Sequence, residues 1–150
     1  MNSSSKLNPA ACGNSEGNQA DQSTEASVSS VSSTRVADAV LELINLMRDA
    51  IAQDAEAQVL AGFLLIAKRG DQNPPNILEV AKLLGTSDAS ASRIVAVLGR
   101  GLRGKPGAGL LETREDPTNY SRKLIFVSPK GQRLLGRLGD TMVASLAKWR

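Results

Sequence analysis

The sequence contains no histidine and a single cysteine, Cys12, among its 150 residues. These absences exclude metal sites built from His and Cys ligands and a framework of disulfide bonds. The lack of histidine also removes most hydrolase chemistry that depends on an imidazole general base. No Gly-x-x-x-x-Gly-Lys-Ser/Thr phosphate-binding motif is present. We therefore expect a protein that is not an enzyme and that needs no metal or other cofactor.

Long apolar segments and aromatic residues are also scarce. No apolar run approaches the ~18 to 20 residues needed to cross a bilayer, and the N-terminus lacks the apolar core of a secretory signal. Aromatic residues make up 3% of the chain, so its core must consist mainly of Leu, Val, Ile and Ala. These features predict a small helical protein in the cytoplasm, without a membrane partner and associated with the nucleoid if it binds DNA.

The net charge of +3 is unevenly distributed along the chain. Residues 93–137 hold ten basic and three acidic residues, whereas residues 34–92 hold five basic and eight acidic residues. A concentrated positive segment is the electrostatic signature of phosphate binding. Its simpler interpretation is a solvated protein surface.

Composition divides the chain into a tail and one folded domain. Residues 1–33 are rich in Ser, Asn, Gln, Gly and Ala and carry almost no large apolar side chains. Such a segment cannot bury enough surface to offset the entropy cost of ordering. We predict a disordered tail over residues 1–33, with Cys12 as an inert exposed thiol, and one domain over residues 34–150.

Three helices are predicted outside the centre of the domain. A first helix runs from a cap at Ser33 or Thr34 to near Ala52, with an apolar stripe at helical spacing: Val36, Val40, Leu43, Ile44, Met47 and Ile51. A second runs from about Ala55 to Lys68, before Gly70. The last is capped by Ser128, with Pro129 at its first position, and its stripe continues to near Trp149: Leu134, Leu135, Leu138, Met142, Val143 and Leu146.

The stripes of the two terminal helices exceed what one small domain needs to bury. Surplus apolar helix faces at both ends of a domain favour a homodimer built from those helices. The alternative is that both helices fold onto their own domain.

The centre of the domain, residues 79–95, reads as two short helices with a tight turn between them. We expect the first helix over Ile77–Leu84 behind the cap Asn76, and the second over Ser87–Arg100. Gly85 permits a left-handed turn, and the Ser87 hydroxyl can cap the second helix. This is the arrangement of a helix-turn-helix. The outer face of its second helix carries short or polar side chains suited to a DNA major groove: Asp88, Ser90, Ser92 and Arg93. Two amphipathic helices around a glycine turn also occur in helical cores that never meet DNA.

A basic glycine-rich segment follows over residues 99–109. It carries Arg100, Arg103 and Lys105 and is predicted to be a flexible loop. Residues 103–106, Arg-Gly-Lys-Pro, are similar to the core of an AT-hook, an arm that lies in narrow A·T minor grooves. A plain flexible linker is the alternative.

Two segments of strand composition, residues 110–115 and 122–127, flank the turn-forming residues 116–121. They predict a β-hairpin directly after the second helix of the pair, which is the position of a wing. The predicted tip carries Asn119, Tyr120, Ser121 and Arg122.

The order of these segments resembles the MarR family of winged helix-turn-helix regulators over about residues 34–148. The most specific part is residues 123–131, Lys-Leu-Ile-Phe-Val-Ser-Pro-Lys-Gly, which resemble the family's Leu-Thr-x-x-Gly. The resemblance implies a homodimer on a palindromic site, with each recognition helix in a major groove and each wing tip in the flanking minor groove. It also implies a small-molecule effector, although nothing in the sequence identifies its pocket. The chain departs from the family at the wing, where Asn119 and Ser121 occupy the positions of an Asp-x-Arg pair and Arg122 lies one place later.

The predicted fold class is mainly α with a small β-hairpin: a winged helix-turn-helix with N- and C-terminal dimerisation helices. The predicted function is a sequence-specific DNA-binding transcriptional regulator, a dimeric repressor that acts by site occlusion on double-stranded DNA. Two alternatives remain, a winged-helix protein-interaction module and a non-specific architectural or replication-linked DNA-binding protein. The candidate DNA-binding residues are Ser87, Asp88, Ser90, Ser92, Arg93, Arg100, Arg103, Lys105, Arg114, Asn119, Arg122 and Lys123.

Overall fold

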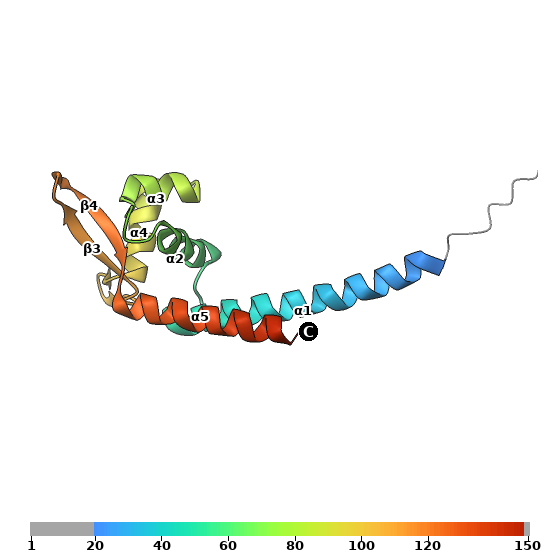
Figure 1. The fold of residues 1–150 in the computed structure, drawn as a ribbon. Helices are drawn as coiled ribbons and strands as arrows, with labels where there is room; N and C mark the ends of the chain where they lie inside the picture. Colours follow the sequence, from blue (N-terminus) through green and yellow to red (C-terminus); the bar gives the residue numbers. More distant parts are fainter. Residues whose placement is uncertain (1–19, 149–150) are drawn as a thin grey trace, which may run out of the picture. The chain divides into compact units, whose positions relative to one another are not determined.

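The computed structural model describes residues 20–148, and their side chains from Ser33 onward. Contacts divide the chain into two compact units, residues 1–34 and residues 35–150. Residues 1–19, including Cys12, and residues 149–150 lie outside the described part. The elements in chain order are α1 (Ala20–Ile51), α2 (Ala57–Arg69), α3 (Ile77–Leu84), α4 (Asp88–Leu98), β1 (Gly101–Leu102), β2 (Lys105–Pro106), β3 (Leu111–Asp116), β4 (Asn119–Val127) and α5 (Pro129–Ala147) (Figure 1).

Helix α1 begins earlier than its apolar stripe predicted. It starts at Ala20, so residues 20–33 are helical and the cap expected at Ser33 or Thr34 is wrong. No glycine or proline occurs within α1, so its sequence lacks the two residues that most disfavour the interior of a helix. The helix ends at Ile51, one residue before the predicted end near Ala52.

The core of residues 35–150 receives side chains from every helix and from both long strands. Its fully buried side chains include Phe63 and Ile66 of α2, Val80 of α3, Leu98 of α4 and Ile125 of β4. The terminal helices contribute further buried side chains to this core, namely Met47 of α1 with Leu134 and Leu138 of α5. As the low aromatic content predicts, the core consists mainly of aliphatic side chains, and Phe63 is its single buried phenylalanine.

Helices α2 and α4 approach each other closely at Gly62. A Cβ added at Gly62 would lie 2.8 Å from Cγ2 of Ile94, which is shorter than real Cβ contacts allow. The missing side chain therefore sets the distance between α2 and α4, and with it the position of α4 against the core.

Two antiparallel hairpins complete the domain. Strands β3 and β4 pair from Leu111↔Val127 to Glu115↔Lys123 and form the predicted wing. The wing is fastened to the loop before α3, because the Ile125 N–H donates to Pro75 O at 2.9 Å and Asn76 forms a β-bridge with Leu124. Its tip points away from α5 (Figure 1).

Helix α5 begins as the sequence predicted. The Ser128 side chain caps it by accepting the Gly131 N–H at 3.1 Å, and Pro129 occupies the first helical position. The helix lies beside the second half of α1 (Figure 1), where the Ser145 hydroxyl donates to the Glu42 carboxylate at 3.3 Å. None of the helices in the described residues is long and apolar enough to cross a membrane.

Candidate nucleic-acid interface

Helices α3 and α4 form a helix-turn-helix whose ends are fixed by local hydrogen bonds. The Asn76 side chain accepts the Glu79 N–H at 3.1 Å, and the Glu79 carboxylate accepts the Asn76 N–H at 3.0 Å, which is a complete capping box. Gly85 ends α3 in the left-handed conformation, at φ 63° and ψ 37°. The Thr86 N–H then donates to Ala81 O at 3.0 Å, so the turn is closed on the last carbonyls of α3.

Helix α4 is buried on one side and open on the other. Ala91, Ile94, Val95 and Leu98 are buried, and the most exposed of them retains 6% of its surface. Asp88, Ala89, Ser92 and Arg93 form the opposite, exposed face. The structure therefore brings three predicted residues together on the outer face of α4. Ala89 joins them, although an alanine carries no polar signal that would have identified it.

Ser87 and Ser90 differ from the other predicted α4 residues. The Ser87 hydroxyl accepts the Ser90 N–H at 3.2 Å and donates to the Ser90 hydroxyl at 3.0 Å. Ser87 is exposed, whereas Ser90 is half-buried and faces the turn rather than lying on the outer face. The Ser87 hydroxyl caps the helix and the Ser90 hydroxyl binds that cap, so both hydroxyls are engaged within the protein.

The segment after α4 forms a short hairpin in place of the predicted flexible loop. Leu102 pairs with Lys105, and Gly101 pairs with Pro106. A Cβ at Gly101 would lie 2.3 Å from Lys105 O, so the two strands can meet there only without a side chain. Gly101 and Gly104 have positive φ, at 97° and 82°, which a glycine adopts readily. Residues 101–106 therefore form an ordered hairpin, and they are neither an extended arm similar to an AT-hook nor a flexible linker.

The spacing of Gly99, Gly104 and Lys105 in this segment matches part of a phosphate-binding loop. Pro106 stands where that motif requires a hydroxyl, and the segment follows a helix instead of connecting a strand to a helix. A nucleotide-binding loop is therefore not formed here.

The wing has an irregular tip. Asp116 pairs with Asn119 and Glu115 pairs with Lys123, so three residues of β4 bulge out between these pairs. Tyr120, in the bulge, is 77% exposed and is the most exposed large hydrophobic side chain of the described residues. Arg122 also lies in the bulge and is exposed. The bulge interrupts the strict alternation of side chains along β4 at Arg122, which lies one place after the position expected for the wing arginine.

The turn at the wing tip is held by two side chains. The Asp116 carboxylate accepts the Thr118 hydroxyl at 2.7 Å and the Thr118 N–H at 2.8 Å. These hydrogen bonds, together with the positive charge of Arg122, hold the pKa of Asp116 below its ordinary value of 3.8. Asn119 accepts the Ser121 N–H at 3.1 Å, so its side-chain oxygen is also engaged within the tip.

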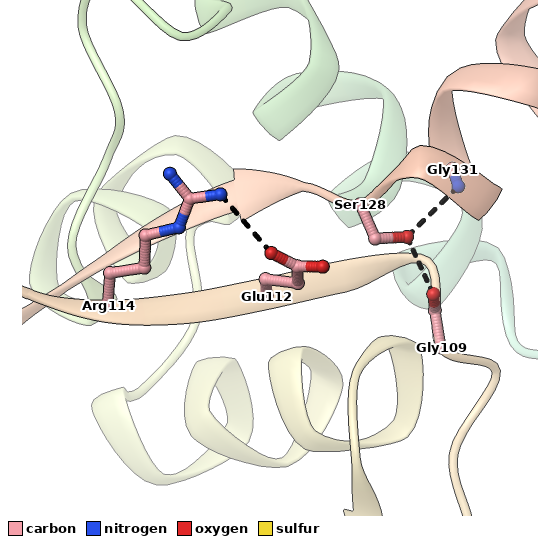
Figure 2. A network of polar contacts seen from close by, with 5 residues as sticks. All are labelled: Gly109, Glu112, Arg114, Ser128 and Gly131. Atoms are coloured by element: carbon pink, nitrogen blue, oxygen red, sulfur yellow. Dashed lines mark hydrogen bonds and ion pairs between the residues drawn. The ribbon is translucent and has the colours of Figure 1, made fainter.

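The cations of the interface fall into two groups. Arg114 is engaged, since its guanidinium lies 3.3 Å from the Glu112 carboxylate (Figure 2) and 4.7 Å from the centroid of the Phe126 ring. Within residues 33–148 no ion pair involves the other predicted cations, which are Arg93, Arg100, Arg103, Lys105, Arg122 and Lys123. All six are exposed. These cations are available to an external anion.

A groove joins the wing to the helix-turn-helix. It has a volume of about 350 Å³ and is lined by Asn76, Ile77, Leu78, Asn119, Ser121, Arg122 and Lys123. Its position brings the predicted wing residues beside the start of α3. No group of three or more Cys, Asp or Glu side chains in the described part of the chain could hold a metal ion.

Solved structures with the same arrangement of elements are transcriptional regulators. A variant of MepR from S. aureus bound to an oligodeoxyribonucleotide has a TM-score of 0.60 at 15% identity, covering 81% of this chain and 82% of that chain. Tm0710 from Thermotoga maritima, a transcriptional regulator, has a TM-score of 0.58 at 16% identity, covering 85% and 78%. The MarR-like regulator Tm0816 from the same organism has a TM-score of 0.52 at 18% identity, covering 75% and 77%.

No protein-family model and no curated protein sequence matches the chain significantly. At these identities the structural likeness concerns the fold. The chain has the winged helix-turn-helix fold of MarR-like regulators, and the fold class predicted from its sequence is confirmed.

Proposed function

We propose that this protein is a sequence-specific DNA-binding transcriptional regulator. The observation that carries the proposal is the outer face of α4, where Asp88, Ser92 and Arg93 are exposed on a helix whose other side is buried in the core. A helix fixed in this way exposes its polar side chains while its apolar side chains stay buried in the core. This is the arrangement needed to read base edges in a major groove.

The exposed side chains of α4 suit different parts of a base pair. Arg93 can donate two hydrogen bonds to the O6 and N7 atoms of a guanine, which is a strongly discriminating contact. The Ser92 hydroxyl reads bases with little selectivity. Asp88 repels phosphate but can accept a hydrogen bond from cytosine N4. The small Ala89 allows the helix to approach the groove floor. Ser87 and Ser90 then support the reading indirectly, by holding the first turn of α4.

The wing supplies contacts beside the reading helix. Lys123 and Arg122 are exposed cations near the tip, and Asn119 and Tyr120 add polar groups there. Together they fit the sugar–phosphate backbone or the minor groove that flanks the major groove occupied by α4. We expect Arg114 to contribute less, because Glu112 and Phe126 already hold its guanidinium.

The protein acts as a homodimer in this proposal. Val36, Val40 and Leu41 of α1 and Met142, Val143 and Leu146 of α5 are between 45% and 67% exposed. An apolar surface formed by two adjacent helices is costly in water and is covered when a second copy packs on it. The twofold symmetry of such a pair requires a palindromic DNA site with half-sites about one helical turn apart. The domain over residues 34–150 would then be the subunit of the dimer.

The simplest regulatory mechanism for such a dimer is repression by occupying a promoter, in the cytoplasm and bound to the nucleoid. A small-molecule effector would shift its affinity for that site. No catalytic role is proposed.

Selection of bound sites from random DNA duplexes tests the proposal. The expected result is a palindrome whose half-sites lie about one helical turn apart. Recovery of DNA with no common sequence would instead support architectural binding. Failure to recover any DNA at low salt would support the protein-interaction module and would overturn the regulator.

A further inference from the structure

The β1–β2 hairpin is a rigid extension of the recognition helix α4. Its base is tied to the last turn of α4, because the Ala108 N–H donates to Val97 O at 2.9 Å and the Leu110 N–H donates to Leu98 O at 2.7 Å. These bonds satisfy carbonyls that every helix leaves open at its C-terminus. The hairpin therefore moves together with α4.

A second set of bonds fixes the hairpin from the side of α5. The Lys130 ammonium donates to Ala108 O at 2.8 Å, and the Ser128 hydroxyl donates to Gly109 O at 2.6 Å (Figure 2). Gly107 comes so close to the residue that ends α4 that an added Cβ would lie 2.2 Å from Gly99 O. With both of its sides held, the hairpin has a defined position in the domain.

The hairpin carries charge of one sign without compensation. Arg100, Arg103 and Lys105 are exposed, and no Asp or Glu occurs in the sequence between Asp88 and Glu112. Glu112, the acidic residue that follows, is engaged by Arg114 at 3.3 Å. Arg103 and Lys105 on the hairpin and Arg100 just before it repel one another, and an external anion would relieve that repulsion. The surface is therefore suited to an anionic partner.

We propose that the β1–β2 hairpin is a phosphate clamp, which grips the DNA backbone where the C-terminal end of α4 leaves the major groove. The proposal rests on the proposed function of α4. Helix α4 has 11 residues and is about 16 Å long, whereas the major groove is about 12 Å wide. An element fixed beyond the last turn of the helix thus comes to the phosphates at the groove wall.

The geometry favours backbone contact over base reading. Arg103 and Gly104 form the turn between the paired residues Leu102 and Lys105, so the basic residues do not lie along an extended arm. A minor-groove arm has to be extended to follow the groove floor. Guanidinium and ammonium groups at a rigid turn instead match the phosphate oxygens, which carry no sequence information.

The test compares Arg103→Ala/Lys105→Ala with the control Arg133→Ala/Arg137→Ala. Both double variants remove two exposed cations, so they change the net charge equally. Affinity for the selected site and for random duplex is measured from about 50 to about 200 mM salt. We expect the hairpin variant to lower the log–log salt slope by roughly two units for each bound protomer. Over this salt range the affinity of the hairpin variant would then fall about tenfold less, for each protomer, than the affinity of the unmodified protein. The ratio of its affinities for the selected site and for random duplex should not change.

The control variant should keep the original slope. Equal slopes for the hairpin variant and the unmodified protein would overturn the clamp, and so would a loss confined to sites with A·T-rich flanks, which would mean minor-groove reading. The placement of α4 in the major groove, on which the clamp rests, is tested separately by Arg93→Ala. If Arg93→Ala abolishes discrimination while the hairpin variant changes nothing, only the clamp fails. If neither variant affects DNA binding, the clamp and the placement of α4 in the major groove both fail.

Discussion

The Ser128 hydroxyl donates a hydrogen bond to the Gly109 carbonyl oxygen at 2.6 Å while accepting the Gly131 N–H at 3.1 Å (Figure 2). One buried side chain thus joins the end of the basic segment to the first turn of α5. Gly131 completes the junction, since a Cβ there would lie 2.3 Å from Leu110 O. The Ser-Pro-Lys-Gly motif therefore sets where the wing and α5 meet.

Replacing this serine should destabilise the whole domain. Ser128→Ala removes the cap of α5 and leaves Gly109 O without its donor, and each loss costs about 1 kcal/mol. We expect the free energy of unfolding to fall by about 2 kcal/mol, measured by urea denaturation. Ser121→Ala, at the exposed wing tip, should change it by less than about 0.5 kcal/mol. An unchanged midpoint for Ser128→Ala would show that other groups hold the junction.

Arg93 should carry much of the sequence discrimination. Arg93→Ala removes a bidentate contact with a guanine, which is worth about 1 to 3 kcal/mol, or roughly 5- to 150-fold in affinity for the selected site. Binding to random duplex should change much less. Competition binding with matched and shuffled duplexes measures both quantities. Undiminished preference for the selected site in Arg93→Ala would contradict the placement of α4 in the major groove.

The apolar face of α5 should control assembly. Val143 is 67% exposed in the single chain, so Val143→Glu should leave the fold intact but place a charge in the proposed dimer surface. Sedimentation should give a monomer, and affinity for the palindrome should fall with it. Arg137→Glu, on the opposite side of α5, serves as the matched control for oligomeric state. A dimer that survives Val143→Glu would place the subunit contact elsewhere.

The wing tip should respond to acid in a defined range. Because the folded state lowers the pKa of Asp116 below 3.8, the carboxylate stabilises the tip fully above 3.8. That contribution is lost as the pH falls further, through the folded-state pKa. Exchange of the Thr118 amide hydrogen, followed from neutral pH downward, reports the change. In Asp116→Asn the amide should be less protected at neutral pH and should show no such transition.

Local chemistry explains which elements could be predicted from the sequence. Asn76, Ser87 and Ser128 each cap a helix as expected, because a cap depends on one side chain and the next three residues. The helix-turn-helix and the strands of the wing followed from apolar spacing and turn residues. They are confirmed to within a few residues.

Contacts between distant residues explain what could not be predicted. The hairpin over residues 101–106 depends on Ala108 and Leu110 binding the end of α4, which no local pattern reveals. The bulge at the wing tip, which exposes Tyr120, depends on where the pairing of β3 with β4 resumes. The position of the Ser90 side chain, whose hydroxyl accepts a hydrogen bond from the Ser87 hydroxyl at 3.0 Å, likewise follows from a contact that the polar pattern of α4 does not show.

Leu110 links the end of α4 to the start of α5. Its N–H donates to Leu98 O and its carbonyl accepts the Ser128 N–H, so the last turn of α4 and the first turn of α5 are both bound to this one residue. The start of α5 therefore cannot pivot on its own. The middle of α5 contains Gly136 and Gly139, both exposed and with open space around them, and glycine makes a helix easier to bend there. In the proposed dimer, a change in the distance between the two α4 helices would be accommodated by bending of α5 at these two glycines.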